Sequence, residues 1–178
     1  NIPAVKAYLA AGQEENIKPF LKWLWITSLK DDHEYGYSLA LWAWEVSMLE
    51  MAQAYSALSQ WGMTAEINPI LEIKDKDGNI LYQKKVEKKD TWLKPEVAYL
   101  MWEILSNPSN MPWGWVNYYS IKWLKYGVKS WTSNKVIKDW DKEVSVPRDG
   151  WLATYTPSRV TMYWAGNAND KPMNKNAL

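Results

Sequence analysis

The spacing of apolar residues changes along the chain, and this change limits the possible folds more than any other feature. In the first 106 residues, four segments place apolar residues at helical intervals: Pro3 to Gly12, Asn16 to Leu24, Ser47 to Ser59 and Pro95 to Ser106. The third segment begins with Ser47 and has Glu50 three residues later, which predicts a capping box. The pattern therefore predicts four helices, each with one buried face.

Apolar residues that alternate with polar ones predict strands elsewhere in the chain. Five segments have this pattern: 69–74, 79–83, 126–133, 151–156 and 159–165. The first two flank residues 75–78, Asp-Lys-Asp-Gly, which is a sequence typical of a hairpin turn. Residues 134–150 show no periodic pattern, and we expect a polar loop there.

Strands that follow helices favour an α+β fold over a fold with alternating units. We predict an antiparallel sheet flanked by helices, with the strand near Lys129 next to the strand near Trp151. Helices from the first hundred residues should pack on one side of this sheet. The 178 residues are enough for a single domain with a core, and no internal repeat or linker divides them.

Composition excludes several kinds of function. The net charge is +1 with 23% charged residues, which gives no electrostatic basis for binding nucleic acid or an anionic membrane. No run of 18 apolar residues is present. Cysteine is absent and His33 is the only histidine, so disulfides, thiolate chemistry and Cys/His zinc sites are excluded. His33 lies in a polar run and is predicted to be a solvated loop residue, and we expect no cofactor.

One strand carries a pattern of residues suited to acyl transfer. Lys129-Ser130-Trp131-Thr132-Ser133 places a cation and three hydroxyls within five residues. It resembles the K-[ST]-G-T-[ST] strand of penicillin-binding transpeptidases and serine β-lactamases, in which this strand forms one wall of the active site. The glycine of that pattern is Trp131 here.

The whole chain resembles the C-terminal part of the transpeptidase domain of class A, or bifunctional, penicillin-binding proteins. Tyr35 to Val46 resembles the family pattern Y-G-x-S-L-A-L-G-x-G-E-V, and Met51 to Tyr55 matches M-A-x-A-Y. Six blocks stand in family order besides the Lys129 strand: 1–5, 35–46, 51–55, 77–81, 151–157 and 163–167. The resemblance implies that residues 1–178 are the C-terminal part of an incomplete transpeptidase domain.

The resemblance also implies a peptidoglycan D,D-transpeptidase that crosslinks peptide stems through a serine acyl-enzyme and binds β-lactams. Lys129 and Asn1 would help hold the proton network and the substrate, and Ser130 and Thr132 would bind the substrate carboxylate. Ser133 and Trp131 would be further substrate-binding residues. The Thr132 backbone N–H would be one oxyanion donor. The nucleophilic serine of S-x-x-K lies upstream in this family, and no such pattern precedes the Asn1 block. The chain alone is therefore predicted to be inactive.

The family's location and partners follow from the same resemblance. It implies the cell envelope, on the extracytoplasmic face of the plasma membrane, with membrane contact only through an upstream anchor. Peptidoglycan peptide stems and β-lactams are the expected partners. Three other interpretations remain: a D,D-carboxypeptidase or β-lactamase of the same fold, a catalytically dead structural relic, or a tryptophan-rich carbohydrate-binding module that stacks sugars on exposed indoles.

Tryptophan is used in an unusual way, with 14 Trp against one Phe and eight Gly. Five tryptophans stand where the family has glycine: Trp25, Trp42, Trp44, Trp61 and Trp131. Trp23, Trp115 and Trp123 are further candidates, whereas Trp151 and Trp164 match the family as tryptophan. We hypothesise that one codon, read as glycine in the source, is represented as tryptophan at these sites.

Overall fold

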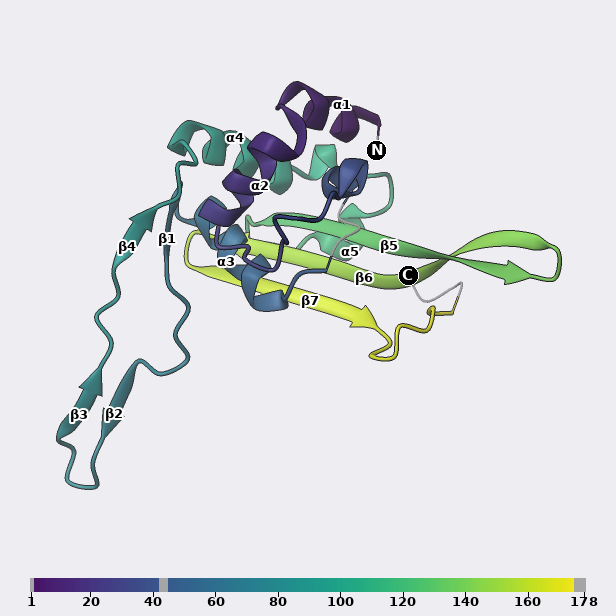
Figure 1. Ribbon diagram of the computed structural model, residues 1–178. Helices are drawn as coiled ribbons and strands as arrows, with labels where there is room; N and C mark the ends of the chain where they lie inside the picture. The colour runs from purple at the N-terminus through teal and green to yellow at the C-terminus, as the bar shows by residue number, and fades with distance from the viewer. Residues whose placement is uncertain (1, 42–44, 175–178) are drawn as a thin grey trace.

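A three-stranded antiparallel sheet forms the centre of the protein (Figure 1). The computed structural model describes residues 2–41 and 45–174. The sheet consists of β5 (Gly127–Asp139), β6 (Lys142–Thr156) and β7 (Arg159–Gly166), in that spatial order. Lys129 pairs with Ala153, so the predicted pairing of the Lys129 strand with the Trp151 strand is confirmed.

The expectation of a polar loop over residues 134–150 is wrong. β5 and β6 continue as one long hairpin, in which Asn134 pairs with Pro147 and Asp139 with Lys142. A two-residue connection, Trp140 and Asp141, closes this hairpin. The ladder depends on backbone groups, which pair whether or not the side chains are apolar. A register shift between Ser133 and Asn134 also interrupts the alternation of side chains between the two faces of β5, so the residues before and after it do not follow one continuous pattern.

The helices agree closely with the helical spacing of the sequence. They are α1 (Ile2–Ala10), α2 (Gln13–Trp23), α3 (Met48–Ser59), α4 (Pro95–Ser106) and α5 (Val116–Tyr119), with short 3-10 turns η1 (Gly36–Leu41) and η2 (Pro108–Asn110). The predicted capping box is confirmed, because the Ser47 hydroxyl accepts from the Glu50 N–H at 3.1 Å and a Glu50 carboxylate oxygen accepts from the Ser47 N–H at 3.1 Å.

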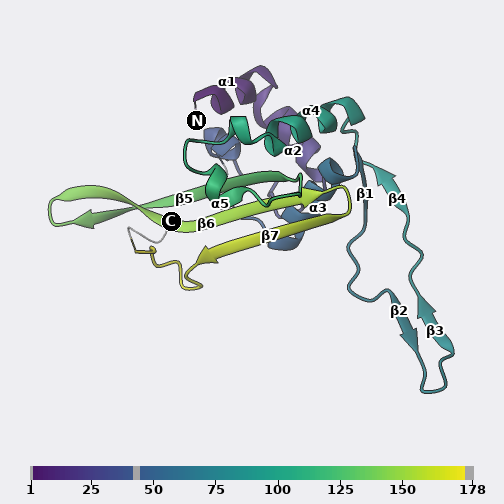
Figure 2. The same ribbon diagram turned by 180° about the vertical axis from the view of Figure 1, so that it is seen from behind.

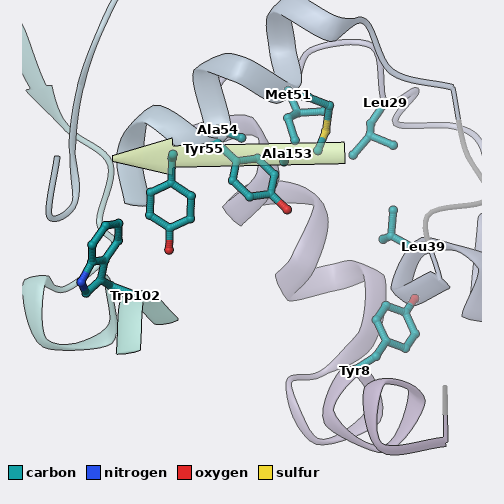
Figure 3. Packing of buried hydrophobic residues seen from close by; sticks show 10 residues of the cluster. Tyr8, Leu29, Leu39, Met51, Ala54, Tyr55, Trp102 and Ala153 are labelled. Carbon is teal, nitrogen blue, oxygen red and sulfur yellow. The ribbon is translucent and has the colours of Figure 1, made fainter. Parts of the chain in front are cut away.

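The core lies between α3 and the sheet. Met51, Ala54 and Tyr55 of α3 lie against Ala153 of β6, with Trp102 of α4 beside them (Figure 3). The face of the sheet that meets α3 also carries Tyr155, which is almost fully buried. Two opposite views place α5 on the other face of the sheet, and α1, α2 and α4 together beyond β5 (Figures 1 and 2). The predicted α+β architecture of a sheet with flanking helices is therefore confirmed.

A narrow arm, residues 63–90, projects from this body (Figure 1). At its base β1 (Met63–Ala65) pairs with β4 (Lys88–Asp90), and at its tip β2 (Glu72–Lys74) pairs with β3 (Ile80–Gln83). Asp75 closes the tip, because its Oδ1 accepts from the backbone N–H of Asp77 at 2.9 Å and of Asn79 at 2.8 Å. The hairpin predicted from the Asp-Lys-Asp-Gly sequence is confirmed.

Candidate active site

The start of β5 is fixed by a close approach of two strands. Gly127 pairs with Tyr155 on β6, and a Cβ at Gly127 would lie 2.3 Å from the Tyr155 ring. Only glycine allows the backbone to pass so close to a buried ring. This contact sets the register that brings Lys129 opposite Ala153 and Ser133 opposite Asp149.

Side chains of the motif alternate between the two faces of β5, as in any strand. Lys129, Trp131 and Ser133 share one face, the face on which Trp131 packs against the α3 core. Ser130 and Thr132 share the other face. β5 is an edge strand among the described residues, because β6 pairs with one of its sides and no described strand pairs with the other. The outer edge of β5 thus faces the helices that lie beyond it rather than another described strand.

Two depressions border the motif. The first, of about 610 Å³, is lined by residues 131–134 of β5 together with residues from other parts of the chain: Leu41, Glu45, Val46, Met48, Arg148, Asp149, Trp151 and Trp164. The second, of about 680 Å³, is lined by Ser130, Trp131 and Thr132 from β5 and by Trp115, Tyr118 and Tyr119 from the α5 region, with Gly150, Trp151, Leu152 and Tyr163. Trp131 and Thr132 border both.

The indole of Trp131 occupies the surface between these depressions. It stacks on Trp151, its cross-strand partner, with ring centroids 5.5 Å apart and an angle of 7° between the planes. A pair of nearly parallel indoles buries apolar surface on both rings. The indole thus covers part of β5 and β6 on the face that carries Lys129 and Ser133.

Lys129 has a polar contact on its own strand. Its ammonium donates to the Ser130 carbonyl oxygen, and although much of the side chain is exposed, partial desolvation of the charged group lowers the pKa of Lys129. A lower pKa increases the neutral fraction, which is the form that accepts a proton. Lys129 is not among the described residues that line the two depressions.

The first depression has a polar end built from strand residues. Ser133 donates its hydroxyl to Asp149 across the β5–β6 pair. Arg148 forms an ion pair with Asp170 at 2.5 Å, and Lys135 pairs with the same carboxylate at 2.6 Å. The hydrogen bond from Lys135 and the charge of Arg148 lower the pKa of Asp170 despite some opposing desolvation. Arg148 and Asp149 were not predicted as site residues, because their position depends on the register of the hairpin, and Glu45 was not predicted because it reaches the depression from the segment before α3.

Two other predicted residues differ in outcome. His33 is exposed and lies outside the helices and strands, which confirms that it is a solvated loop residue. Its ring meets the Tyr35 ring edge-on, with the ring centroids 4.5 Å apart. Asn1, predicted to face the motif, lies outside the described residues, as do Trp42 and Trp44. The convergence of Asn1 with Lys129 therefore stays a prediction.

Comparison with known proteins agrees with this geometry. Residues 10–177 match the family model of the penicillin-binding protein transpeptidase domain, so the chain belongs to that family. A curated relative, penicillin-binding protein 1A/1B of Bacillus subtilis (strain 168), is 26% identical over 171 residues. The match covers 93% of this chain and 18% of that protein, and the predicted class A type is confirmed. Family membership therefore favours the transpeptidase interpretation over a carbohydrate-binding module.

Solved structures share the fold. The penicillin-binding protein PonA1 from Mycobacterium tuberculosis superposes with a TM-score of 0.63 at 18% identity, over 92% of this chain and 44% of PonA1. Penicillin-binding protein A from the same species, solved as an imipenem acyl-enzyme complex, gives a TM-score of 0.65 at 11% identity, over 91% of this chain and 39% of that chain. The chain thus spans less than half the length of these relatives. In the part of the chain that the structure describes, no helix combines the length and apolarity needed to cross a bilayer.

Proposed function

We propose that these residues form one wall of the active site of a peptidoglycan D,D-transpeptidase, which crosslinks peptide stems through a serine acyl-enzyme. The observation that carries this proposal is the Lys129-to-Ser133 motif on an edge strand, bordered by two depressions. An edge strand has backbone donors and acceptors free to pair with an extended peptide. A peptide stem lying along β5 would meet the hydroxyls of the motif.

Each motif residue has a role consistent with its environment. Ser130 and Thr132 donate hydroxyl hydrogen bonds to the carboxylate that ends a peptide stem and that β-lactams also carry. The Thr132 N–H stabilises the oxyanion of the tetrahedral intermediate. Lys129, whose pKa is lowered, relays protons. Ser133, on the other face of β5, is held by Asp149 and fixes the end of the motif strand.

The nucleophile belongs to another part of the protein in this proposal. The 178 residues contain no Ser-x-x-Lys sequence. Acyl transfer needs an activated serine and a second oxyanion donor beside Thr132, both of which an upstream Ser-x-x-Lys segment would supply. A structure of PonA1 is a complex with penicillin V, which supports β-lactam binding as the assay. Its family also supports a place at the outer face of the plasma membrane, held by an anchor elsewhere in the protein.

Covalent labelling with a fluorescent penicillin tests the proposal. The 178-residue chain should give no adduct that survives denaturation, whereas the full protein with Trp131→Gly should label. Adding Thr132→Val should then slow labelling by about 10–100-fold, because a hydrogen bond to a charged group is worth about 1.5–3 kcal/mol. The matched control is Thr161→Val, on β7 of the same sheet, which should label normally. Labelling of the 178-residue chain, or equal effects of the two valine variants, would contradict the assignment.

The related activities differ in what removes the acyl group. A transpeptidase transfers it to an acceptor amine, a carboxypeptidase to water, and a β-lactamase hydrolyses its penicillin adduct quickly. Release of D-alanine with and without an added peptide amine, together with the lifetime of the penicillin adduct, distinguishes the three. We expect a long-lived adduct and amine-dependent product.

A further inference from the structure

Tryptophans in this protein occupy backbone conformations that normally require glycine. Seven described residues other than glycine have a positive φ, and five of the seven are tryptophan although only 14 of the 178 residues are: Trp25 (64°), Trp61 (55°), Trp92 (63°), Trp123 (73°) and Trp140 (58°). A bulky side chain in this region is a steric outlier, because Cβ crowds the following carbonyl. Chance placement of tryptophan does not give such a concentration.

Two of these residues end helices in the same way. After α2, the Trp25 N–H donates to the Lys22 carbonyl oxygen at 2.8 Å, and the Ile26 N–H donates to the Leu21 carbonyl oxygen at 3.0 Å. After α3, the N–H of Trp61 donates to the Leu58 carbonyl oxygen at 3.4 Å, and the N–H of Gly62 donates to the Ala57 carbonyl oxygen at 2.8 Å. This is the Schellman pattern, whose left-handed C′ residue is usually glycine.

Two more of these tryptophans lie in turns whose backbone geometry favours glycine. Trp123 is the third residue of a turn closed by the Leu124 N–H and the Ile121 carbonyl oxygen at 3.1 Å. A positive φ at that position is the mark of a type II turn, which takes glycine there. Trp140 is the first residue of the two-residue connection between β5 and β6. A type II′ hairpin turn places glycine at that first position.

Core packing does not explain three of the five indoles, because these are largely exposed. Trp92 is 72% exposed, Trp123 is 89% exposed and Trp140 is 96% exposed. Stored strain sometimes serves an active site, but then it clusters at that site. Here the strained residues are spread over two helix ends, the approach to α4, a turn before β5 and the tip of a hairpin.

Other tryptophans have ordinary helix or strand backbones, and one of them is buried in the core. Trp102 in α4 is 8% exposed and meets the buried ring of Tyr155 edge-on at 5.4 Å. Trp151 lies within β6 with ordinary strand pairing. Trp23 is the last helical residue of α2 and Trp115 has a φ of −72°, so neither has the backbone of the left-handed group. The chain thus contains two kinds of tryptophan site.

We propose that positions 25, 61, 92, 123 and 140 are glycine in the protein that the source organism makes, because one of its codons is read there as glycine. The geometry carries this assignment at five independent sites without reference to any relative. Position 131 joins the set through its place in the Lys-Ser-x-Thr motif, although its backbone is ordinary strand. This last addition rests on the proposed function.

The assignment changes the site as well as the turns. Glycine at position 131 removes the indole that stacks on Trp151 and borders both depressions. The backbone of β5 beside Thr132 is then open to a bound acyl group. The chain with glycine at these positions therefore has relaxed turns and an uncovered motif strand.

A paired substitution separates backbone strain from side-chain bulk. Trp25→Gly and Trp61→Gly should each melt about 2–4 °C higher than Trp25→Ala and Trp61→Ala, because alanine keeps the Cβ that strains a left-handed residue. At Trp23, the last helical residue of α2, the order should reverse, with Trp23→Gly melting below Trp23→Ala by up to about 2–4 °C. Alanine variants equal to or above the glycine variants at positions 25 and 61 would overturn the proposal.

A second measurement does not depend on how the variants fold. Peptide mass spectrometry of the protein isolated from its natural source should find glycine at positions 25, 61, 92, 123, 131 and 140, and tryptophan at Trp102 and Trp151. Tryptophan at the five left-handed positions would overturn the proposal. Glycine at those five with tryptophan at 131 would keep the turn assignment and remove only the part that rests on the proposed function. Neither result depends on whether the protein binds penicillin.

Discussion

The body of the protein, α3 with the β5–β6–β7 sheet, and the arm, residues 63–90, are both built on antiparallel strands, yet they differ in what the strands bury. In the body, Met51, Ala153 and Tyr155 are almost fully enclosed between helix and sheet. In the arm, Leu71, Ile80 and Leu81 are all at least half exposed, as are several neighbours. An isolated two-stranded hairpin is marginal in water.

This difference in burial indicates which part of the protein supplies its stability. Burial of apolar side chains is the main favourable term in folding, so the free energy of unfolding of this protein is concentrated in the body. The motif strand β5 belongs to the body and is held rigid by it. The arm can change or open locally with little effect on the motif.

The largest difference is expected for truncation of matched apolar side chains. Met51→Ala should lower the free energy of unfolding by about 2–5 kcal/mol, because Met51 is fully buried and its removal leaves a cavity. Leu81→Ala in the arm should change it by less than about 0.5 kcal/mol, because Leu81 is 67% exposed. Urea unfolding of the two variants measures both. Similar losses would mean that the arm is part of the cooperative core.

Glu50 makes the body sensitive to acid. Its carboxylate accepts from the backbone N–H groups of Thr27 at 2.7 Å, Ser28 at 2.8 Å and Ser47 at 3.1 Å. Burial alone would raise its pKa, but these hydrogen bonds outweigh that effect and lower the pKa of Glu50 from 4.5 to about 2. A lowered pKa means that the unfolded chain binds the proton more tightly, so stability rises with pH between about 2 and 4.5.

Glu50→Gln should therefore destabilise the protein by roughly 3 kcal/mol at neutral pH, and the loss should shrink as the pH falls towards 2. Urea unfolding at pH 7 and at pH 3 measures this difference. The arm offers a control in Glu66→Gln, whose partner Lys84 lies in an exposed ion pair, and this change should have little effect at either pH. A pH-independent loss for Glu50→Gln would show that packing, not charge, is responsible.

The sequence predicted those parts of the fold that depend on local patterns. The capping box of Ser47 and Glu50, the turn after Asp75 and the pairing of the Lys129 and Trp151 strands follow from spacing and turn chemistry. The extension of β5 and β6 through residues 134–150 did not follow. A glycine at position 140 would have marked the turn of that hairpin, and Trp140 removed this signal.

The candidate site was predictable only along one strand. Lys129 to Ser133 are consecutive, so their proximity needs no tertiary information. Asp149 meets Ser133 only because of the register of β6, and the aromatic residues of the α5 region reach the second depression from a turn without periodic pattern. Such contacts join residues far apart in sequence, and no local propensity records them.

A smaller effect is expected where β5 begins. Gly127→Ala should cost about 1–3 kcal/mol, because the added methyl meets the Tyr155 ring, which is too buried to move freely. In the arm, a Cβ at Gly78 meets no atom within 4 Å, and Gly78→Ala should cost about 1 kcal/mol from its positive φ alone. Equal melting temperatures for the two variants would contradict the tight contact at Gly127.

The smallest effect is expected at the Tyr155 hydroxyl, in the most enclosed part of the body. This oxygen is buried and has no hydrogen-bond partner among the described residues, and burial raises the pKa of Tyr155 to about 12. Tyr155→Phe removes a polar atom that gains nothing in the folded state, so the free energy of unfolding should stay within about 0.5 kcal/mol or increase. Tyr155→Leu is the matched comparison, because it also removes the ring that contacts Tyr55 and Trp102, and it should be clearly destabilising. A large loss for the phenylalanine variant would reveal a bound water or polar partner at this oxygen and would show that the body is held by more than apolar burial.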